Sequence, residues 1–153
     1  MGVGRAAYAD PDEARRAFYV GMNLRALGAK KVFDAFKRVI WFYEDDKVAV
    51  VEDVMEDEKC GYDGKRLIVD KANARLAIAV NNCNVYYDAF KLAADVPATA
   101  DEISVVLDAM RKVRTFKHVK ALYDMFRYVA DAKVSDEEDV DVERLKEMAK
   151  RIG

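Results

Sequence analysis

The amino-acid sequence predicts a mainly α-helical protein, an antiparallel helix bundle formed by one domain over residues 1–153. Three observations favour this fold. Several segments carry helix start signals, their apolar residues recur every three or four positions, and the connections between segments are short. With 52% hydrophobic and 35% charged residues, the composition is that of an ordered globular protein. Residues 1–9 are rich in Gly and Ala and are expected to form an N-terminal arm.

Helix start signals mark three positions. Asp10 can cap a helix whose first residue is Pro11, and Glu13 lies three residues after the cap. Two further sites have the spacing of a capping box: Thr99 with Glu102, and Ser135 with Glu138. We therefore expect helices over about 11–27, 99–131 and 136–151.

The segment 29–44 is predicted to form another helix. Its apolar residues are three or four positions apart, as on one helix face: Val32, Phe36, Val39, Ile40 and Tyr43. Residues 47–58 allow two structures. The spacing of Val48, Val51 and Val54 suits a short helix, whereas the unbroken run 48–51 suits a strand equally well.

Residues 65–90 also allow two structures. The segments 66–70 and 75–80 can pair as a small β-hairpin across the turn at 71–73. Alternatively, Asp70 caps a long helix with a heptad-like apolar row: Leu76, Val80, Cys83, Tyr87 and Phe90. The regular spacing of this row favours the helix, although Asn81, Asn82 and Asn84 are poor helix formers.

The missing residue types indicate adaptation to high temperature. The chain contains no Gln, two Ser and two Thr, and charged residues stand where uncharged polar residues are usual. Ion-pair networks become less costly on heating and side-chain amides are thermolabile, so this composition is typical of a hyperthermophile. Intracellular disulfides are common in such organisms. Cys60 and Cys83 are therefore expected either to form a disulfide or to remain as buried thiols.

Charge is unevenly distributed along the chain. Residues 1–43 hold eight Lys and Arg against four Asp and Glu, whereas residues 44–64 hold two against nine. This segregation suits contact with a polyanion, or head-to-tail contact between copies of the chain. Within the predicted helix 99–131, a basic cluster interrupts the apolar row. Candidate nucleic-acid ligands are Arg111, Arg114, Lys117 and His118 in that cluster, with Arg15, Arg16, Lys30 and Lys31 as a second surface.

The sequence lacks the patterns of common catalytic sites. The glycines near the N-terminus follow no strand, so they are not a dinucleotide loop. No phosphate-binding loop is present, and one His with two Cys is too few for a structural zinc site. We therefore expect a protein that is not an enzyme and has neither cofactor nor metal. No apolar run is long enough for membrane insertion.

In size, predicted helical content, thermophilic composition and segregated charge, the chain resembles the helical coat or nucleocapsid proteins of filamentous or rod-shaped viruses of hyperthermophilic archaea. The resemblance implies a structural protein that self-assembles, alone or with a paralogue, and packages double-stranded DNA through its phosphate backbone without sequence specificity. Its location is then the virion or the cytoplasm of a hyperthermophilic host. The alternative is an archaeal regulator or adaptor that acts through protein–protein contacts.

Overall fold

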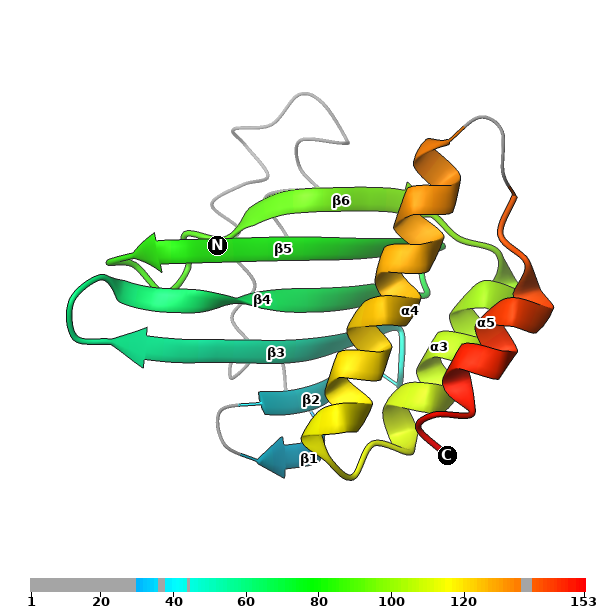
Figure 1. Ribbon diagram of the computed structural model, residues 1–153, viewed down its shortest axis with the longest axis horizontal. Helices are drawn as coiled ribbons and strands as arrows, with labels where there is room; N and C mark the ends of the chain where they lie inside the picture. The colour runs from blue at the N-terminus through cyan, green and yellow to red at the C-terminus, as the bar shows by residue number, and fades with distance from the viewer. Residues whose placement is uncertain (1–29, 36–37, 44, 136–138) are drawn as a thin grey trace.

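The computed structural model describes residues 30–35, 38–43, 45–135 and 139–153, which form a six-stranded antiparallel sheet followed by three helices (Figure 1). The strands are β1 (Lys30–Ala35), β2 (Arg38–Tyr43), β3 (Val48–Asp57), β4 (Gly61–Asp70), β5 (Arg75–Asn84) and β6 (Lys91–Pro97). The helices are α3 (Ala100–Arg111), α4 (Phe116–Val134) and α5 (Val142–Ala149). The strands lie in the sheet in chain order, so each pairs with its neighbours in sequence.

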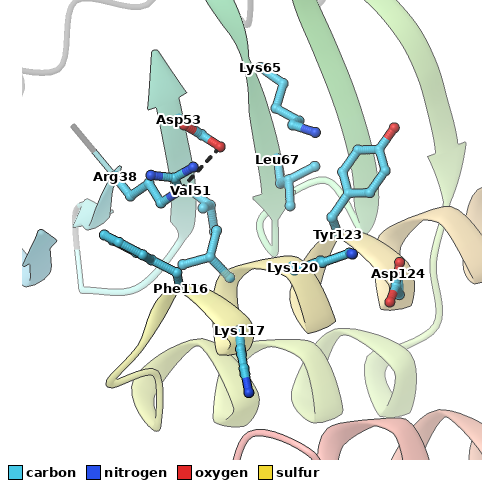
Figure 2. A pocket seen from close by; sticks show the side chains of 11 residues that line it. Arg38, Val51, Asp53, Lys65, Leu67, Phe116, Lys117, Lys120, Tyr123 and Asp124 are labelled. Carbon is cyan, nitrogen blue, oxygen red and sulfur yellow. Dashed lines mark ion pairs between the residues drawn. The ribbon is translucent and has the colours of Figure 1, made fainter. Parts of the chain in front are cut away.

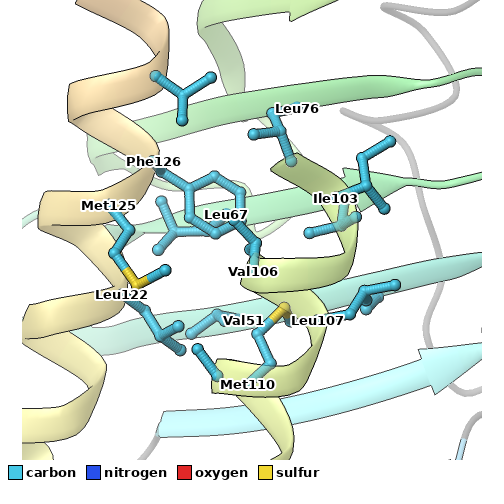
Figure 3. Packing of buried hydrophobic residues seen from close by; sticks show 14 of the residues in the cluster. Val51, Leu67, Leu76, Ile103, Val106, Leu107, Met110, Leu122, Met125 and Phe126 are labelled. Carbon is cyan, nitrogen blue, oxygen red and sulfur yellow. The ribbon is translucent and has the colours of Figure 1, made fainter. Parts of the chain in front are cut away.

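The three helices lie on one face of the sheet (Figure 1). α3 and α4 pack on the strands, and α5 packs against α3 and α4. The core between these layers is apolar and closely filled, as Figure 3 shows. It includes Val51, Leu67 and Leu76 from the strands, and Val106, Met110, Leu122 and Phe126 from the helices. Burying each such side chain contributes about 1.5–3 kcal/mol, which fixes the helical layer on the sheet.

The second face of the sheet is also lined by buried apolar side chains. Tyr43, Val50, Ile68 and Ala77 form a separate cluster there. Each lies next in sequence to a residue of the helix-side core, and successive side chains of a strand point to opposite faces. Because both faces are apolar, the strands lack the alternation of polar and apolar residues that identifies a strand with one wet face.

The predicted all-α bundle is wrong, and burial of both sheet faces is the physical reason. Residues 30–35 and 38–43 pair as antiparallel strands, where a helix over 29–44 was predicted. Val39 and Ile40 were expected on one face of a helix. They are neighbours along β2, so their side chains point to opposite faces of the sheet. A short apolar run that is buried on both sides cannot be distinguished from a buried helix by periodicity. The same holds for 48–57, where the strand alternative is the structure observed.

The favoured helix over 70–90 is wrong as well, since the hairpin alternative is the structure observed. Leu67 lies opposite Ile78, and Asp70 lies opposite Arg75. At the turn, the Asp70 carboxylate accepts hydrogen bonds from the backbone N–H of Asn73 at 3.1 Å and from its side-chain amide at 2.8 Å. Local bonding of this kind favours a turn over helix continuation. The heptad-like spacing was coincidental.

One of the predicted helix caps is present in the structure, whereas the other predicted helix bounds differ. The Thr99–Glu102 capping box is confirmed, because the Thr99 hydroxyl accepts from the Glu102 N–H and the Glu102 carboxylate accepts from the Thr99 N–H. The predicted helix 99–131 is instead two helices, since α3 ends at Arg111 and α4 begins after Thr115. Ser135 ends α4, and α5 is capped by Asp141. The predicted arm 1–9 and helix 11–27 lie outside the described residues.

The sheet also removes the main basis of the resemblance to helical coat proteins. That resemblance depended on predicted helical content, whereas the largest element of the described chain is a sheet. The fold gives no support to assignment to a virus or to an archaeal host.

A buried ion pair lies within the second face of the sheet. The Arg66 guanidinium is fully buried, and its Nε lies 3.0 Å from Oε2 of Glu52, which is also buried. The rings of Phe90 and Tyr87 lie 4.1 and 5.1 Å from the guanidinium carbon. A charge in such a place is tolerated only when it is paired, so Glu52 is needed to hold Arg66 in the sheet.

We expect Glu52→Ala to lower the free energy of unfolding by about 3 kcal/mol, because it removes the carboxylate that lies 3.0 Å from the buried Arg66 Nε. Urea denaturation followed by circular dichroism measures this. Glu56→Ala is the matched control, since Glu56 lies on the same strand with an exposed side chain; its effect should stay below about 0.5 kcal/mol. Equal stability of the two variants would contradict the assigned role of Glu52.

Candidate functional site: a cationic pocket between the sheet and α4

A pocket of about 520 Å³ lies where α4 crosses β2, β3 and β4 (Figure 2). The long strands β3, β4 and β5 extend beyond α4 on the side away from α3 (Figure 1). The pocket therefore lies in the corner between the flank of a helix and the face of a sheet. Aliphatic side chains that also belong to the main core line it: Val51, Leu67 and Val119.

A row of charged residues crosses the sheet at this pocket. Arg38 lies opposite Asp53 in the β2–β3 pair, and Asp53 lies opposite Lys65 in the β3–β4 pair. The Arg38 Nε is 3.4 Å from Asp53 Oδ2. Asp53 and Lys65 lie two residues from Val51 and Leu67, so they point toward the helical side of the sheet. Charges thus replace apolar residues where the helical layer ends.

Aromatic rings of α4 hold two of these cations at the pocket. The guanidinium of Arg38 lies 4.6 Å from the ring centre of Phe116, and the ammonium of Lys65 lies 4.0 Å from that of Tyr123. Attraction between a cation and a ring face is worth about 0.5–1 kcal/mol at exposed sites. Figure 2 shows Arg38 with Phe116 on one side of the pocket and Lys65 with Tyr123 on the other.

The first turns of α4 add two lysines. Lys120 reaches toward Tyr123 and Asp124, whereas the ammonium of Lys117 points away from the other labelled side chains (Figure 2). Within the part of the chain that the structure describes, no carboxylate lies within ion-pair distance of Lys65, Lys117 or Lys120. Arg38, Lys65 and Lys120 thus place three cations at the pocket against two carboxylates, Asp53 and Asp124. Its charge suits an anion.

The predicted ligands of the basic cluster do not form one row, because the helix is interrupted among them. Arg111 ends α3, where it pairs with Asp46 and packs on the Phe42 ring. The Arg114 side chain donates hydrogen bonds to two backbone carbonyls of the same turn. His118 accepts the Arg114 backbone N–H at Nδ1, at 2.9 Å. Of the four predicted ligands in the cluster, Lys117 alone lines the pocket, beside Lys120 at the end of the same cluster.

The second predicted surface is described only in part. Arg15 and Arg16 lie outside the described residues. Lys30 and Lys31 are exposed on β1, where they are opposite Phe42 and Trp41. The Lys31 ammonium lies 2.9 Å from the Asp34 carboxylate and 5.3 Å from the ring centre of Trp41. Neither lysine lines the pocket.

The sequence reasoning missed Arg38 and Lys65, and it did not select Lys120, although Lys120 lies at the end of the basic cluster 111–120. The signal of Asp53 and Lys65 is visible only once residues 48–57 and 61–70 are treated as strands. Asp53 then continues the inward series of Ala49 and Val51, and Lys65 begins the series that contains Leu67 and Val69. A charge at an inward position marks the point at which the helical cover ends.

The cysteines lie at the far end of the sheet and not at the pocket. Cys60 and Cys83 form a disulfide that joins the β3–β4 turn to the end of β5. No group of three or more His, Cys, Asp or Glu side chains within the described ranges is placed to hold a metal ion. Among the same residues, no helix has the length and apolar character needed to cross a bilayer.

Tyr87 is a second candidate functional group, because its hydroxyl donates a hydrogen bond to Oε1 of the buried Glu52. Burial, together with this hydrogen bond and the Glu52 charge, raises the pKa of Tyr87 from 10.0 to about 12. Burial likewise raises the pKa of Tyr43 above its usual value. A phenol with a raised pKa is neutral near pH 7 and is a poor nucleophile or base, so this cluster is structural.

The chain was compared with protein-family models, curated proteins and solved structures, and nothing in any of the three matches it.

The raised pKa of Tyr87 predicts a pH dependence of stability. Because the folded-state pKa lies above the unfolded value, the hydrogen bond to Glu52 contributes fully below pH 10 and is lost as the pH rises through about 12. The difference in unfolding free energy between wild type and Tyr87→Phe should therefore be constant up to pH 10 and shrink above it. Urea titrations from about pH 8 to 12 measure this.

Tyr86→Phe is the matched control, since the Tyr86 side chain is 68% exposed. Its stability should follow that of the wild type across the whole range. If Tyr87→Phe also follows the wild type in parallel up to pH 12, the hydrogen bond does not have the role assigned to it.

Proposed function

We propose that the protein binds a small phosphorylated molecule in the pocket between the sheet and α4, and that it does so without transforming the ligand. The observation that carries the proposal is the pocket itself, with the cations Arg38, Lys65 and Lys120 against two carboxylates around an aliphatic lining. Its volume of about 520 Å³ falls within the range of small-molecule sites, roughly 300–1,000 Å³.

The positions of the cations support an anionic ligand. Lys65 and Lys120 come from facing elements, the sheet and the helix, so one phosphate between them can accept hydrogen bonds from both. Arg38 adds a planar donor group, which Asp53 and Phe116 orient. The aliphatic side chains Val51 and Leu67 suit an apolar part of the same ligand.

This proposal keeps the phosphate chemistry expected from the sequence but changes the ligand. Arg114 and His118 are engaged within the α3–α4 turn, and Arg111 pairs with Asp46 of the β2–β3 turn, so the contacts expected with duplex DNA lose their main residues. A corner between a helix and a sheet suits a compact ligand better than the surface of a rigid duplex. DNA is nevertheless a second source of phosphate, so its binding is measured as well.

The lining residues support binding without catalysis. None of the side chains around the pocket in the described part of the chain is Ser, Thr, Cys or His. The common nucleophile–base pairs of group-transfer enzymes are therefore not assembled there. The predicted association between copies of the chain is compatible with this function, because the pocket lies beside α4 and the far end of the sheet is exposed.

We expect Lys65→Ala/Lys120→Ala to weaken binding of a phosphorylated ligand at least about tenfold, because two charge-assisted hydrogen bonds are lost. The anionic dye 8-anilinonaphthalene-1-sulfonate, which is both apolar and charged, serves as a fluorescent probe of the pocket. Its displacement is measured separately with pyrophosphate, ATP and a short DNA duplex. Lys47→Ala/Lys71→Ala is the matched control, since it removes two exposed lysines away from the pocket.

The proposal expects pyrophosphate or ATP to displace the dye from wild type and from the control, and only weakly from the Lys65→Ala/Lys120→Ala variant. Raising the salt concentration should weaken this binding. Tighter binding of duplex DNA that is insensitive to Lys65 and Lys120 would instead support a nucleic-acid surface elsewhere. Dye binding that neither phosphate displaces would show that the pocket does not select phosphates.

A further inference from the structure

The far end of the sheet exposes two adjacent apolar side chains. In the loop between β5 and β6, Val85 is 66% exposed and Tyr86 is 68% exposed. They lie beside the β3–β4 turn, since the Cα of Val85 is next to Gly61. Large apolar side chains that are held outward in this way are common at contact surfaces between proteins.

The loop that carries these side chains is firmly held. The Tyr86 N–H donates to the Asn84 side chain at 3.0 Å, and the Tyr86 carbonyl accepts from the Asn81 side chain at 3.0 Å. The same carbonyl accepts the Ala89 N–H at 3.2 Å. The Cys60–Cys83 disulfide ties the start of the loop to the neighbouring turn. Binding by a loop fixed beforehand loses little conformational entropy.

Acidic residues surround the loop. Five carboxylates lie on the adjoining turn, strand ends and loop, against two cations, Lys59 and Lys91: Glu56, Asp57, Glu58, Asp63 and Asp88. The far end of the sheet thus has an exposed apolar tip with an acidic border. The pocket beside α4 has the complementary character, being concave, lined by aliphatic side chains and bordered by cations.

One molecule cannot bring these two surfaces together. Lys65 lies four residues along β4 from Gly61, which places it about 13 Å from the turn at about 3.3 Å per residue. The hydrogen bonds and the disulfide hold the loop at that end of the sheet. The tip of one molecule can therefore contact only the pocket of another molecule.

We propose that the Val85–Tyr86 loop of one copy of the chain docks in the cationic pocket of a second copy, so that molecules associate head to tail. The proposal rests on the proposed function, because it names a further occupant of the same anion-binding pocket. Contact between two different surfaces is heterologous, so it produces open chains or closed rings instead of a two-fold dimer. A phosphorylated ligand competes with the loop, and ligand binding therefore dissociates the assembly.

A contact made by one loop is small, so the association is expected to be weak and sensitive to salt. Sedimentation equilibrium of the full chain should show an average mass that rises with concentration at about 50 mM salt and approaches the monomer at about 500 mM. Pyrophosphate, added at constant ionic strength, should lower it in the same way. A wild type that remains monomeric up to about 1 mM protein would overturn the proposal.

Mixing two variants tests the head-to-tail geometry. Val85→Ser/Tyr86→Ser removes the tip and keeps the pocket, whereas Lys65→Ala/Lys120→Ala weakens the pocket and keeps the tip. Each variant alone should be monomeric, and an equimolar mixture should form a dimer and nothing larger. Val134→Ser, which changes a 75% exposed side chain away from both surfaces, is the control and should associate like the wild type.

The outcomes separate this proposal from the function on which it rests. If the pocket variant associates as strongly as the wild type, the loop docks elsewhere and the head-to-tail contact is wrong. Phosphate binding is measured independently on the monomeric Val85→Ser/Tyr86→Ser variant, which retains the pocket. Thermal unfolding of each variant checks that lost association does not reflect lost folding.

Discussion

The length of the central strands, relative to the width of the helical layer, is the constraint on which the rest of the structure depends. β3, β4 and β5 have ten residues each, about 33 Å at 3.3 Å per residue. Two helices side by side cover roughly 20 Å. The described helices therefore leave one end of the sheet's helical face open. Arg38, Asp53 and Lys65 lie at that boundary, where apolar residues would otherwise face water.

The sequence predicts an element correctly where its local signals agree, and wrongly where one apolar pattern fits both a helix and a strand. The Thr99 capping box marks the start of α3 because a hydroxyl, a carboxylate and an apolar period all indicate the same residue. In β2, Ile40 and Tyr43 are both buried although they belong to opposite faces. Apolar and polar residues therefore do not alternate along β2, and the three-residue spacing of Ile40 and Tyr43 resembles that of a helix. Only the tertiary structure shows which layer covers each face of the sheet.

The candidate site follows the same logic. The basic cluster at 111–120 stands out in the sequence, yet Arg114 and His118 bond within the turn between α3 and α4, and Arg111 pairs with Asp46 of the β2–β3 turn. The pocket is built from Lys65 and Arg38 of the sheet, which are separated from Lys120 by tens of residues. Their proximity depends on the angle at which α4 crosses the strands. That angle cannot be predicted from the local sequence.

The chain order of the strands has a consequence for synthesis of the protein. Each strand pairs with the one made just before it, so the sheet can extend as the chain leaves the ribosome. The helices that cover its core face follow all six strands. A nascent chain thus carries an open apolar surface, with Val51 and Leu67 at its centre, until α3 and α4 emerge. Aggregation therefore competes most strongly with folding when translation has passed β6 and has not yet reached the end of α4.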